Sequence, residues 1–500
     1  MLLTAVIAYL VVTIAIGLIA ARGVRGSADF LVAGRSLPTY MTLTTVFATW
    51  YGAEAVLSIS VTAARDGLSG IPADPFGAST CLLLVALLFA KHFYRMNLLT
   101  IGDFYRKRYG KSVEVLTSLA IAASYVGWTS AQLTAIGLMT NILTRGAVSI
   151  DQGILIGACV VLMYTVWGGM ISVAFTDLFQ SAVVIVGLLG IAWYVGDLAG
   201  GPSVVIAAAH EAGRLEFFPH GPQANWWEFS AAFLTMALGS IPQQDVFQRV
   251  TSARDERSAI RGTVGGALLY FTMAFVPMFI VYATLVVDPS VAATFEAEDA
   301  REVQRILPDL ILDKTPIWAQ TIFFGALVSA LLSTASGALL APTSLITENV
   351  LRPFMGQISD RRFLLVLRIV LVCCVATAAL FAFNSRSTMY EIVESAYKVT
   401  LVCAFVPLAA GIWWKPATVQ GALASSGFGV IVWLAFEGGL SERFGIPAQL
   451  VGLAASLVAM VVGSLAPQVY TERRRHESNP EFHPESHPES SRINDPPASA

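Results

Sequence analysis

The feature of this sequence that most constrains its fold is a succession of long apolar runs. A helix needs about 20 mostly apolar residues to cross the hydrocarbon core of a bilayer, and about thirteen runs approach that length. A soluble domain has no use for so many, so the sequence predicts an all-α integral membrane protein with about 13 transmembrane helices. The approximate bounds of the runs are 3–21, 40–63, 73–93, 113–143, 149–167, 170–197, 226–248, 263–287, 317–347, 363–384, 390–412, 417–437 and 447–469.

The composition supports this prediction and excludes several functions. Hydrophobic residues make up 55% of the chain and charged residues 13%, which is far more apolar than a soluble globular protein. The net charge of −3 gives no indication of a basic surface that would bind nucleic acid. No apolar run pairs a nucleophile with a base, so we do not expect an enzyme. The cysteines lie inside apolar runs and are interpreted as small buried hydrophobic residues: Cys81, Cys159, Cys373, Cys374 and Cys403.

The basic residues predict how the helices are oriented. If the N-terminus is outside, most of the 31 Lys and Arg residues, Arg249 among them, fall in cytoplasmic segments. We therefore expect a multi-pass protein of the cell (inner) membrane, with its N-terminus outside and its C-terminus in the cytoplasm. Residues 1–470 form one transmembrane domain in this interpretation. Residues 471–500 are rich in Pro, Glu, Ser and His and are expected to form a disordered cytoplasmic tail.

Two of the apolar runs are interrupted by residues that break or hollow a helix. The second run contains "ATWYGAEA" (48–55) and the seventh contains "GSIPQQD" (239–245). The two runs are five spans apart, so the interrupted helices cross the membrane in opposite directions. This is the pattern of an inverted repeat, here about 40–197 and 226–412, whose broken helices form a binding site near the midplane. The alternative is that each break is a kink closed by packing.

A third polar feature is a face of small and hydroxyl residues in the ninth run. At helical spacing this face contains Ala330, Ser333, Thr334, Gly337 and Ala341. Such a face permits close helix packing, which is the structural interpretation. It also suits a site for a hard cation, in which two hydroxyl oxygens join carbonyls freed by a broken helix.

Three segments resemble the sodium:solute symporter family: "ADFLVAGRSL" (28–37), "GGMISVAFTDLFQ" (168–180) and "LLSTASGALLAPTSLITENV" (331–350). The resemblance implies a five-plus-five inverted repeat of the leucine-transporter type, with one extra helix before it and two after. It also implies a symporter that imports a small organic solute by alternating access. The coupling ion is Na+, no other cofactor is expected, and the partners are the solute, sodium and the lipid bilayer.

The family resemblance implies particular residues for the ion. The sodium-binding positions match Ala48 and Tyr51 in the interrupted helix and Ala330, Ser333 and Thr334 in the hydroxyl face. Asp177 matches a position on the cytoplasmic sodium path. Its alternative role is a charge near a helix N-terminus at the membrane interface.

Within the family the chain is most similar to the choline transporter branch, through "FATWYGAE" (47–54) and "GSIPQQDVFQRV" (239–250). That branch holds a quaternary ammonium between tryptophans, because an aromatic face attracts a cation. The resemblance implies a quaternary amine or other cationic solute; the alternatives are an amino acid, a monocarboxylate or a sugar, and, in another class, a transporter-like membrane sensor. The implied substrate-binding residues are Trp50, Glu54, Trp128, Gln132, Gln243 and Gln244.

Three of these substrate residues carry a qualification. Gln243 stands where the branch has a third tryptophan, and Glu54 stands where it has a glycine. Gln132, one turn beyond Trp128, is interpreted either as a substrate ligand or as a hydrogen-bonding contact to a neighbouring helix.

Overall fold

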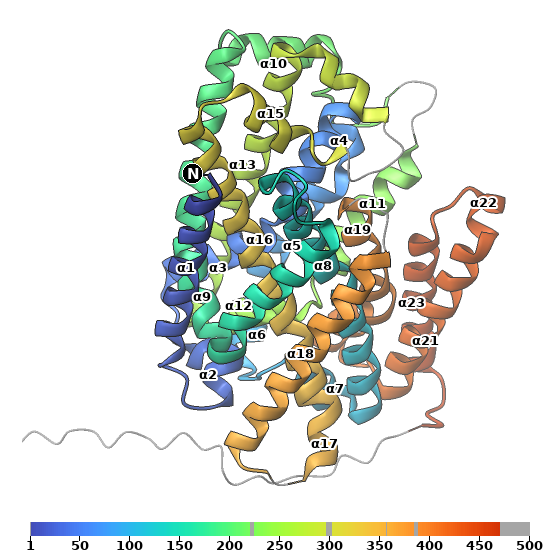
Figure 1. Ribbon diagram of the computed structural model, residues 1–500. Coiled ribbons are helices and arrows are strands. Elements are labelled where there is room, and N and C mark those ends of the chain that lie inside the picture. Colours follow the sequence, from blue (N-terminus) through green and yellow to red (C-terminus); the bar gives the residue numbers. More distant parts are fainter. Residues whose placement is uncertain (1, 221–224, 297–302, 357, 385–388, 471–500) are drawn as a thin grey trace, which may run out of the picture.

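The protein is a bundle of helices, as the computed structural model shows (Figure 1). The structure describes residues 2–220, 225–296, 303–356, 358–384 and 389–470. Apart from helices, these residues form a single isolated β-bridge, between Leu37 and Ala253. The all-α prediction is therefore confirmed. The predicted tail, 471–500, lies outside the described residues.

The helices have the following bounds: α1 Leu2–Ala21, α2 Ser27–Val32, α3 Thr39–Trp50, α4 Ile59–Asp66, α5 Ala78–Leu84, α6 Ala90–Arg95, α7 Ile101–Tyr109, α8 Lys111–Leu143, α9 Ile150–Leu198, α10 Pro202–Glu211, α11 Trp226–Gly239, α12 Gln244–Thr251, α13 Glu256–Val287, α15 Ile306–Lys314, α16 Ile317–Leu345, α17 Arg352–Met355, α18 Asp360–Asn384, α19 Met389–Thr400, α20 Val406–Trp413, α21 Val419–Ala435, α22 Ser441–Phe444 and α23 Ala448–Leu465. Shorter helical segments join several of them: η1 Ala33–Arg35, η2 Glu54–Ser58, η3 Leu68–Gly70, η4 Pro72–Gly77, η5 Val85–Phe89, η6 Pro289–Glu296, η7 Ile346–Leu351, η8 Leu401–Phe405 and η9 Phe436–Leu440.

Among the described residues, nine helical segments are long and apolar enough to cross a membrane, and the bent pair α3–α4 makes a tenth. The other three predicted runs also lie on helices. Run 113–143 lies on α8, run 149–167 on the first part of α9, and run 226–248 on α11 and α12. These three do not qualify as unbroken spans by length and composition.

The fifth and sixth predicted runs are parts of one element, α9, which breaks at Gly169. This residue has φ +49° and ψ −141°, a left-handed conformation that glycine adopts without strain. A Cβ at this position would also collide with the carbonyl oxygen of Phe30 in α2. The predicted boundary between the runs therefore falls at a backbone break, and α2 packs against it.

The helices differ sharply in how deeply they lie in the bundle. In the most apolar 18-residue window of α16 89% of the residues are buried, against 17% in α1 and 28% in the span that includes α21. Figure 1 shows α1 on one side of the bundle and α21 and α23 on the other. The first and last two spans are therefore peripheral, and α16 is central.

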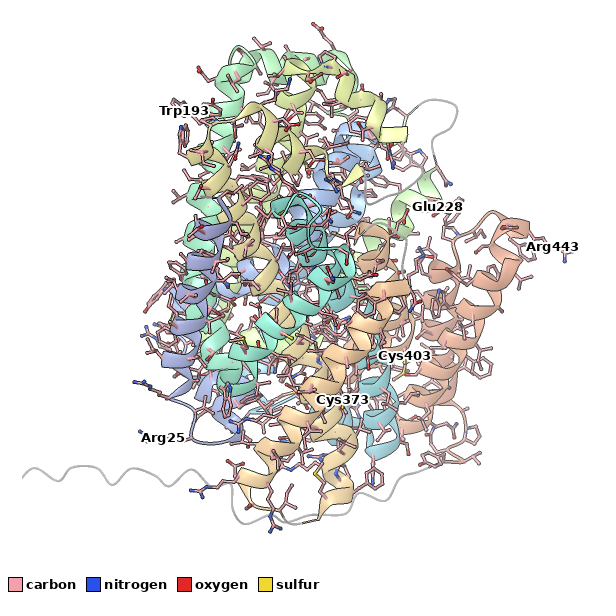
Figure 2. All side chains as sticks on the ribbon, viewed as in Figure 1. Arg25, Trp193, Glu228, Cys373, Cys403 and Arg443 are labelled. Atoms are coloured by element: carbon pink, nitrogen blue, oxygen red, sulfur yellow. The ribbon has the colours of Figure 1, made fainter. Side chains whose placement is uncertain are left out.

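The outer surface of the bundle is apolar, as a lipid-facing surface must be. Trp193 is 75% exposed and projects from the periphery (Figure 2). The prediction that all five cysteines are buried is wrong for Cys159 and Cys373, which are exposed on outward faces, and Cys374 is only partly buried. The reason is that an apolar run in a membrane helix has a face turned to lipid, so apolar neighbours do not indicate burial.

Candidate functional site

The end of α3 meets the middle of α16 at a cluster of oxygen atoms. Ser333 Oγ and Thr334 Oγ1 both donate to the carbonyl oxygen of Ala48, over 3.2 and 3.1 Å. Because α3 ends at Trp50, the carbonyls of its last turn lack the intrahelical partners that a continuous helix would supply. The break therefore presents backbone oxygen to the hydroxyl face of α16, as expected for the predicted cation site.

The other two predicted sodium-binding residues lie at the same place. Ala48, Tyr51, Ala330 and Ser333 line one small pocket together with Gln180 of α9. The side chain of Tyr51 points away from this pocket, because its hydroxyl donates to the carbonyl of Met273 in α13 (3.0 Å). Only the backbone carbonyl of Tyr51 remains as a ligand for a cation.

Asp177 of α9 is in direct contact with the hydroxyl pair. Its Oδ1 lies 2.5 Å from Ser333 Oγ, so Asp177 and the more distant Ala48 carbonyl share the single hydroxyl hydrogen of Ser333. Its Oδ2 has no hydrogen-bond partner among the described residues, and the residue is fully buried. Asp177 therefore packs against the centre of α16, and its position relative to the membrane interface stays a prediction.

Four aromatic side chains form a buried group that we term the aromatic cluster: Trp50 of α3, Trp128 of α8, Tyr270 of α13 and Tyr397 of α19. Trp50 stacks on Tyr397 with an interplanar angle of 6° and a centroid distance of 6.3 Å. The Trp50 and Trp128 centroids are 6.4 Å apart, and Trp50 also meets Tyr270 edge-on. The structure thus brings the two predicted tryptophans together and adds two tyrosines that the sequence did not single out.

Glu54 and Gln132 form hydrogen bonds with each other and with the backbone at the break that follows α3. Gln132 Nε2 donates to Glu54 Oε2 (2.6 Å), and Gln132 Oε1 accepts from the backbone N–H of Ala53 (3.0 Å). Trp128 Nε1 donates to Glu54 Oε1 (3.3 Å). A Cβ on Gly52 would lie 2.7 Å from Glu54 Oε2, so glycine is required for this close approach. Gln132 was predicted either to bind substrate or to bond a neighbouring helix, and in the structure it bonds the broken segment after α3.

The second break, between α11 and α12, contains two glutamines with different surroundings. Gln243 Nε2 donates to Ser124 Oγ of α8 (3.1 Å) and to Thr400 Oγ1 of α19 (3.3 Å). Gln244 Oε1 instead accepts from the backbone N–H of Ile101, at the start of α7 (2.8 Å). The structure therefore places Gln243 beside the helices that carry the aromatic cluster and directs Gln244 elsewhere.

Three buried charged residues near the site were not identified from the sequence. Tyr270 and Tyr125 donate hydrogen bonds to the carboxylates of Asp74 and Asp245, respectively. Arg249 Nε donates to Thr49 Oγ1 (2.9 Å), and Arg249 is only 2% exposed. The sequence placed Arg249 in a cytoplasmic segment; the structure shows it buried on α12, which continues beyond the apolar run. All three residues could have been found in the sequence as charges within or next to apolar runs.

Arg249 lies between the two breaks. Its guanidinium attracts both Asp177 and Asp245. A Cβ on Gly337 of α16 would lie 2.5 Å from Arg249 Nη2, so the small residue of the hydroxyl face leaves room for this side chain. The face therefore serves close packing as well as the oxygen cluster.

A separate buried polar cluster joins α7, α8 and η7. Asn349 Nδ2 donates to Glu114 Oε1 (2.8 Å) and to Asp103 Oδ1 (3.1 Å), and its Oδ1 accepts from Thr100 Oγ1 (2.8 Å). All four side chains are buried. Asn349 thereby connects the end of the central α16 segment to the short helix α7.

Comparison with known proteins gives a consistent result. Residues 30–429 match the model of the sodium:solute symporter family. High-affinity choline transporter 1 of Caenorhabditis elegans is 25% identical over 420 residues, covering 81% of this chain and 70% of the relative. The osmoregulated proline transporter OpuE of Bacillus subtilis (strain 168) is 23% identical over 474 residues, covering 91% and 93%.

Solved structures show the same fold. A Na+-coupled sialic acid symporter in a substrate-bound outward-open state has a TM-score of 0.79 at 18% identity, covering 93% of this chain and 97% of its own. A nucleobase-cation-symport-1 family transporter has a TM-score of 0.55 at 15% identity, covering 86% and 93%. The predicted fold of the leucine-transporter type is confirmed.

Proposed function

The chain belongs to the sodium:solute symporter family, and on this premise we propose that it imports a small organic cation with sodium by alternating access. The observation that carries the proposal is the double contact of Ser333 and Thr334 with the Ala48 carbonyl, beside Asp177. Hard cations bind oxygen ligands. Two hydroxyls, carbonyls of a broken helix and one carboxylate supply them here.

Sodium at this position supports coupling to the solute. The ion would hold α3 against α16, and Trp50 of the aromatic cluster lies two residues from Ala48. An ion that stabilises this arrangement also orders the aromatic wall, so ion and solute each favour binding of the other. One charge moving through 100 mV supplies about 2.3 kcal/mol, or roughly 50-fold accumulation.

The charge balance around the aromatic cluster supports a cationic solute. Aromatic faces attract cations, particularly when desolvated. The buried carboxylates Glu54, Asp74 and Asp245 border the cluster, and Tyr397 interacts electrostatically with all three. Arg249 is also buried and attracts the carboxylate of Asp245, so it offsets part of this negative charge. The choline transporters among the relatives agree with this class of solute.

Import also depends on the orientation in the membrane. We propose an outside N-terminus and a cytoplasmic C-terminus, because that orientation places most Lys and Arg residues on the cytoplasmic side. Arg25, at the lower end of the bundle in Figure 2, belongs to that side.

A zwitterionic amino acid is the second candidate, since the proline transporter matches this chain over 91% of its length. Ligand-dependent thermal stability of the purified protein separates the candidates, because a ligand that binds only the folded state stabilises it. Quaternary amines, amino acids, monocarboxylates and sugars would each be tested in sodium and in potassium. We expect sodium-dependent stabilisation by cations. Stabilisation by an anion or a sugar alone would contradict the proposal.

A further inference from the structure

The second helix break contains two buried oxygen atoms that accept no hydrogen bond from any described residue. They are Asp245 Oδ2 and Gln243 Oε1. Asp245 is fully buried and Gln243 is 1% exposed. Buried polar atoms are nearly always hydrogen-bonded, because desolvation without a partner is costly. Two unused acceptors at one break therefore need an explanation.

The remaining polar atoms of Gln243 and Asp245 do form hydrogen bonds, and these bonds orient the two side chains. Gln243 uses its amide nitrogen on Ser124 and Thr400. Asp245 accepts from the hydroxyl of Tyr125, next to Ser124 in α8, and the Tyr125 hydroxyl also accepts from the Asp245 backbone N–H (2.9 Å). Both side chains are thereby held toward the same turn of α8.

This turn of α8 adjoins the aromatic cluster. Tyr125 lies one turn before Trp128, with ring centroids 5.8 Å apart, and Thr400 lies one turn after Tyr397. One helical turn rises about 5.4 Å. The residues that hold Gln243 and Asp245 are therefore about one helical turn from members of the aromatic cluster, a spacing that suits a solute with a linker of two or three carbons.

We propose that Asp245 and Gln243 form a second subsite, which accepts hydrogen bonds from an N–H or O–H group at the end of the solute opposite its cationic head. The inference rests on the proposed cationic solute and narrows its class. A solute that ends in an amine can donate to both acceptors, and one that ends in a hydroxyl can donate to one of them. One that ends in a carboxylate brings a third acceptor, and a negative charge, against Asp245.

Arg249 is a buried cation near Asp245, but it does not reverse the preference for a donor group over a carboxylate. Its Nη1 approaches the backbone carbonyl of Asp245 (3.5 Å), and its Nη2 has no hydrogen-bond partner in the part of the chain that the structure describes. However, the guanidinium lies toward Thr49 and Gly337, on the α16 side of the break. The side chains of Gln243 and Asp245 are instead hydrogen-bonded to α8, so they and the guanidinium contact different helices at this break.

Four probes with a quaternary ammonium head test the subsite. Tetramethylammonium has no second group, whereas choline ends in a hydroxyl, (2-aminoethyl)trimethylammonium in an amine and glycine betaine in a carboxylate. Affinities would be measured in sodium from thermal stability or calorimetry. For the wild type we expect the amine to bind most tightly, then choline, then tetramethylammonium, with glycine betaine about a hundredfold weaker than the amine.

Asp245→Asn retains an oxygen that accepts from Tyr125 but removes the charge. We expect the amine probe to lose about tenfold to a hundredfold in affinity and glycine betaine to improve, whereas tetramethylammonium should lose only severalfold, because it loses a nearby charge but no hydrogen bond. Asp74→Asn is the matched control, since Asp74 is also a buried carboxylate that accepts from a tyrosine beside the cluster. It should change all cationic probes by a similar factor.

Two outcomes separate this inference from the proposed function. If wild-type protein binds tetramethylammonium but Asp245→Asn weakens all cations equally, the subsite is wrong and the cation proposal stands. If no quaternary ammonium probe binds in sodium, the cation proposal fails and the subsite fails with it. Should Asp245→Asn not fold, Gln243→Met supplies the test, because it removes the second acceptor at similar volume. It should weaken choline severalfold relative to tetramethylammonium, and an unchanged ratio overturns the inference.

Discussion

The oxygen cluster at the α3 break makes a quantitative prediction for Thr334→Val. The substitution keeps the shape of the side chain and removes the hydroxyl that lies 3.1 Å from the Ala48 carbonyl. A net hydrogen bond contributes about 1 kcal/mol to stability. Loss of one oxygen ligand from a site with few should cost sodium binding about 1.4 kcal/mol or more, so the half-saturating sodium concentration should rise about tenfold.

A control variant separates ion binding from folding. Thr284 of α13 is equally buried, and its hydroxyl donates to the Ile280 carbonyl of its own helix (2.8 Å). Thr284→Val removes the same chemical group far along the chain from the cluster. Both variants should lose roughly 1 kcal/mol of stability in potassium, but only Thr334→Val should lose sodium affinity.

The assay is a sodium titration of thermal stability in detergent, with potassium keeping the ionic strength constant, and sodium-dependent uptake in proteoliposomes as a second measurement. The reasoning is refuted if the half-saturating sodium concentration of Thr334→Val stays within twofold of the wild type. It is also refuted if Thr284→Val shifts sodium dependence by the same factor.

Three further predictions concern the surrounding residues. Asp177→Asn removes a buried charge in contact with Ser333 and should weaken sodium binding at least tenfold in the same titration. Binding of the solute at saturating sodium should be retained. An unchanged sodium affinity would contradict a role for Asp177 in binding the ion. Trp50→Phe should reduce affinity for tetramethylammonium severalfold and Trp50→Leu should nearly abolish it, because leucine has no aromatic face; calorimetry with both variants checks this, and equal affinities would exclude a role for the ring. Asn349→Ala removes a donor shared by the buried carboxylates of Asp103 and Glu114, although Asp103 keeps the N–H groups of Leu99 and Thr100 and both carboxylates keep the more distant Arg106. The free energy of unfolding, measured by thermal or denaturant unfolding, should fall by roughly 1–3 kcal/mol, and a change below about 0.5 kcal/mol would contradict a stabilising role for Asn349.

Much of the site could be predicted because polar residues are costly in an apolar span. The glycine and carboxylate of "ATWYGAEA" and the proline of "GSIPQQD" interrupt runs that would otherwise be continuous, and both runs do break in the structure. The hydroxyl face of α16 follows a regular helical period, so Ser333 and Thr334 could be placed on one side from spacing alone. Helical periodicity is local information that a single sequence contains.

The parts that could not be predicted depend on contacts between distant segments. Gln243 and Gln244 are neighbours in a break, where no helical period fixes direction, and they point to different helices. Tyr397 looks like any aromatic residue in an apolar run, and only the packing of α19 against α8 and η2 places it on Trp50. Arg249 lies at the end of an apolar run, so the sequence favoured a cytoplasmic loop and the structure buries it.

The hydrogen bonds that Gln132 makes with Glu54 and Ala53 have a consequence for how relatives of this protein diverge. Gln132 gives its two amide atoms to two different partners on the other side of the α3 break, the Glu54 carboxylate and the Ala53 N–H. Losing either side chain alone leaves a polar group of the other unpaired, whereas a joint replacement can avoid this if the new residues again accept from the Ala53 N–H and Trp128 Nε1. Single substitutions at these positions should therefore be selected against, and positions 54 and 132 should change together across the family, as one inherited unit.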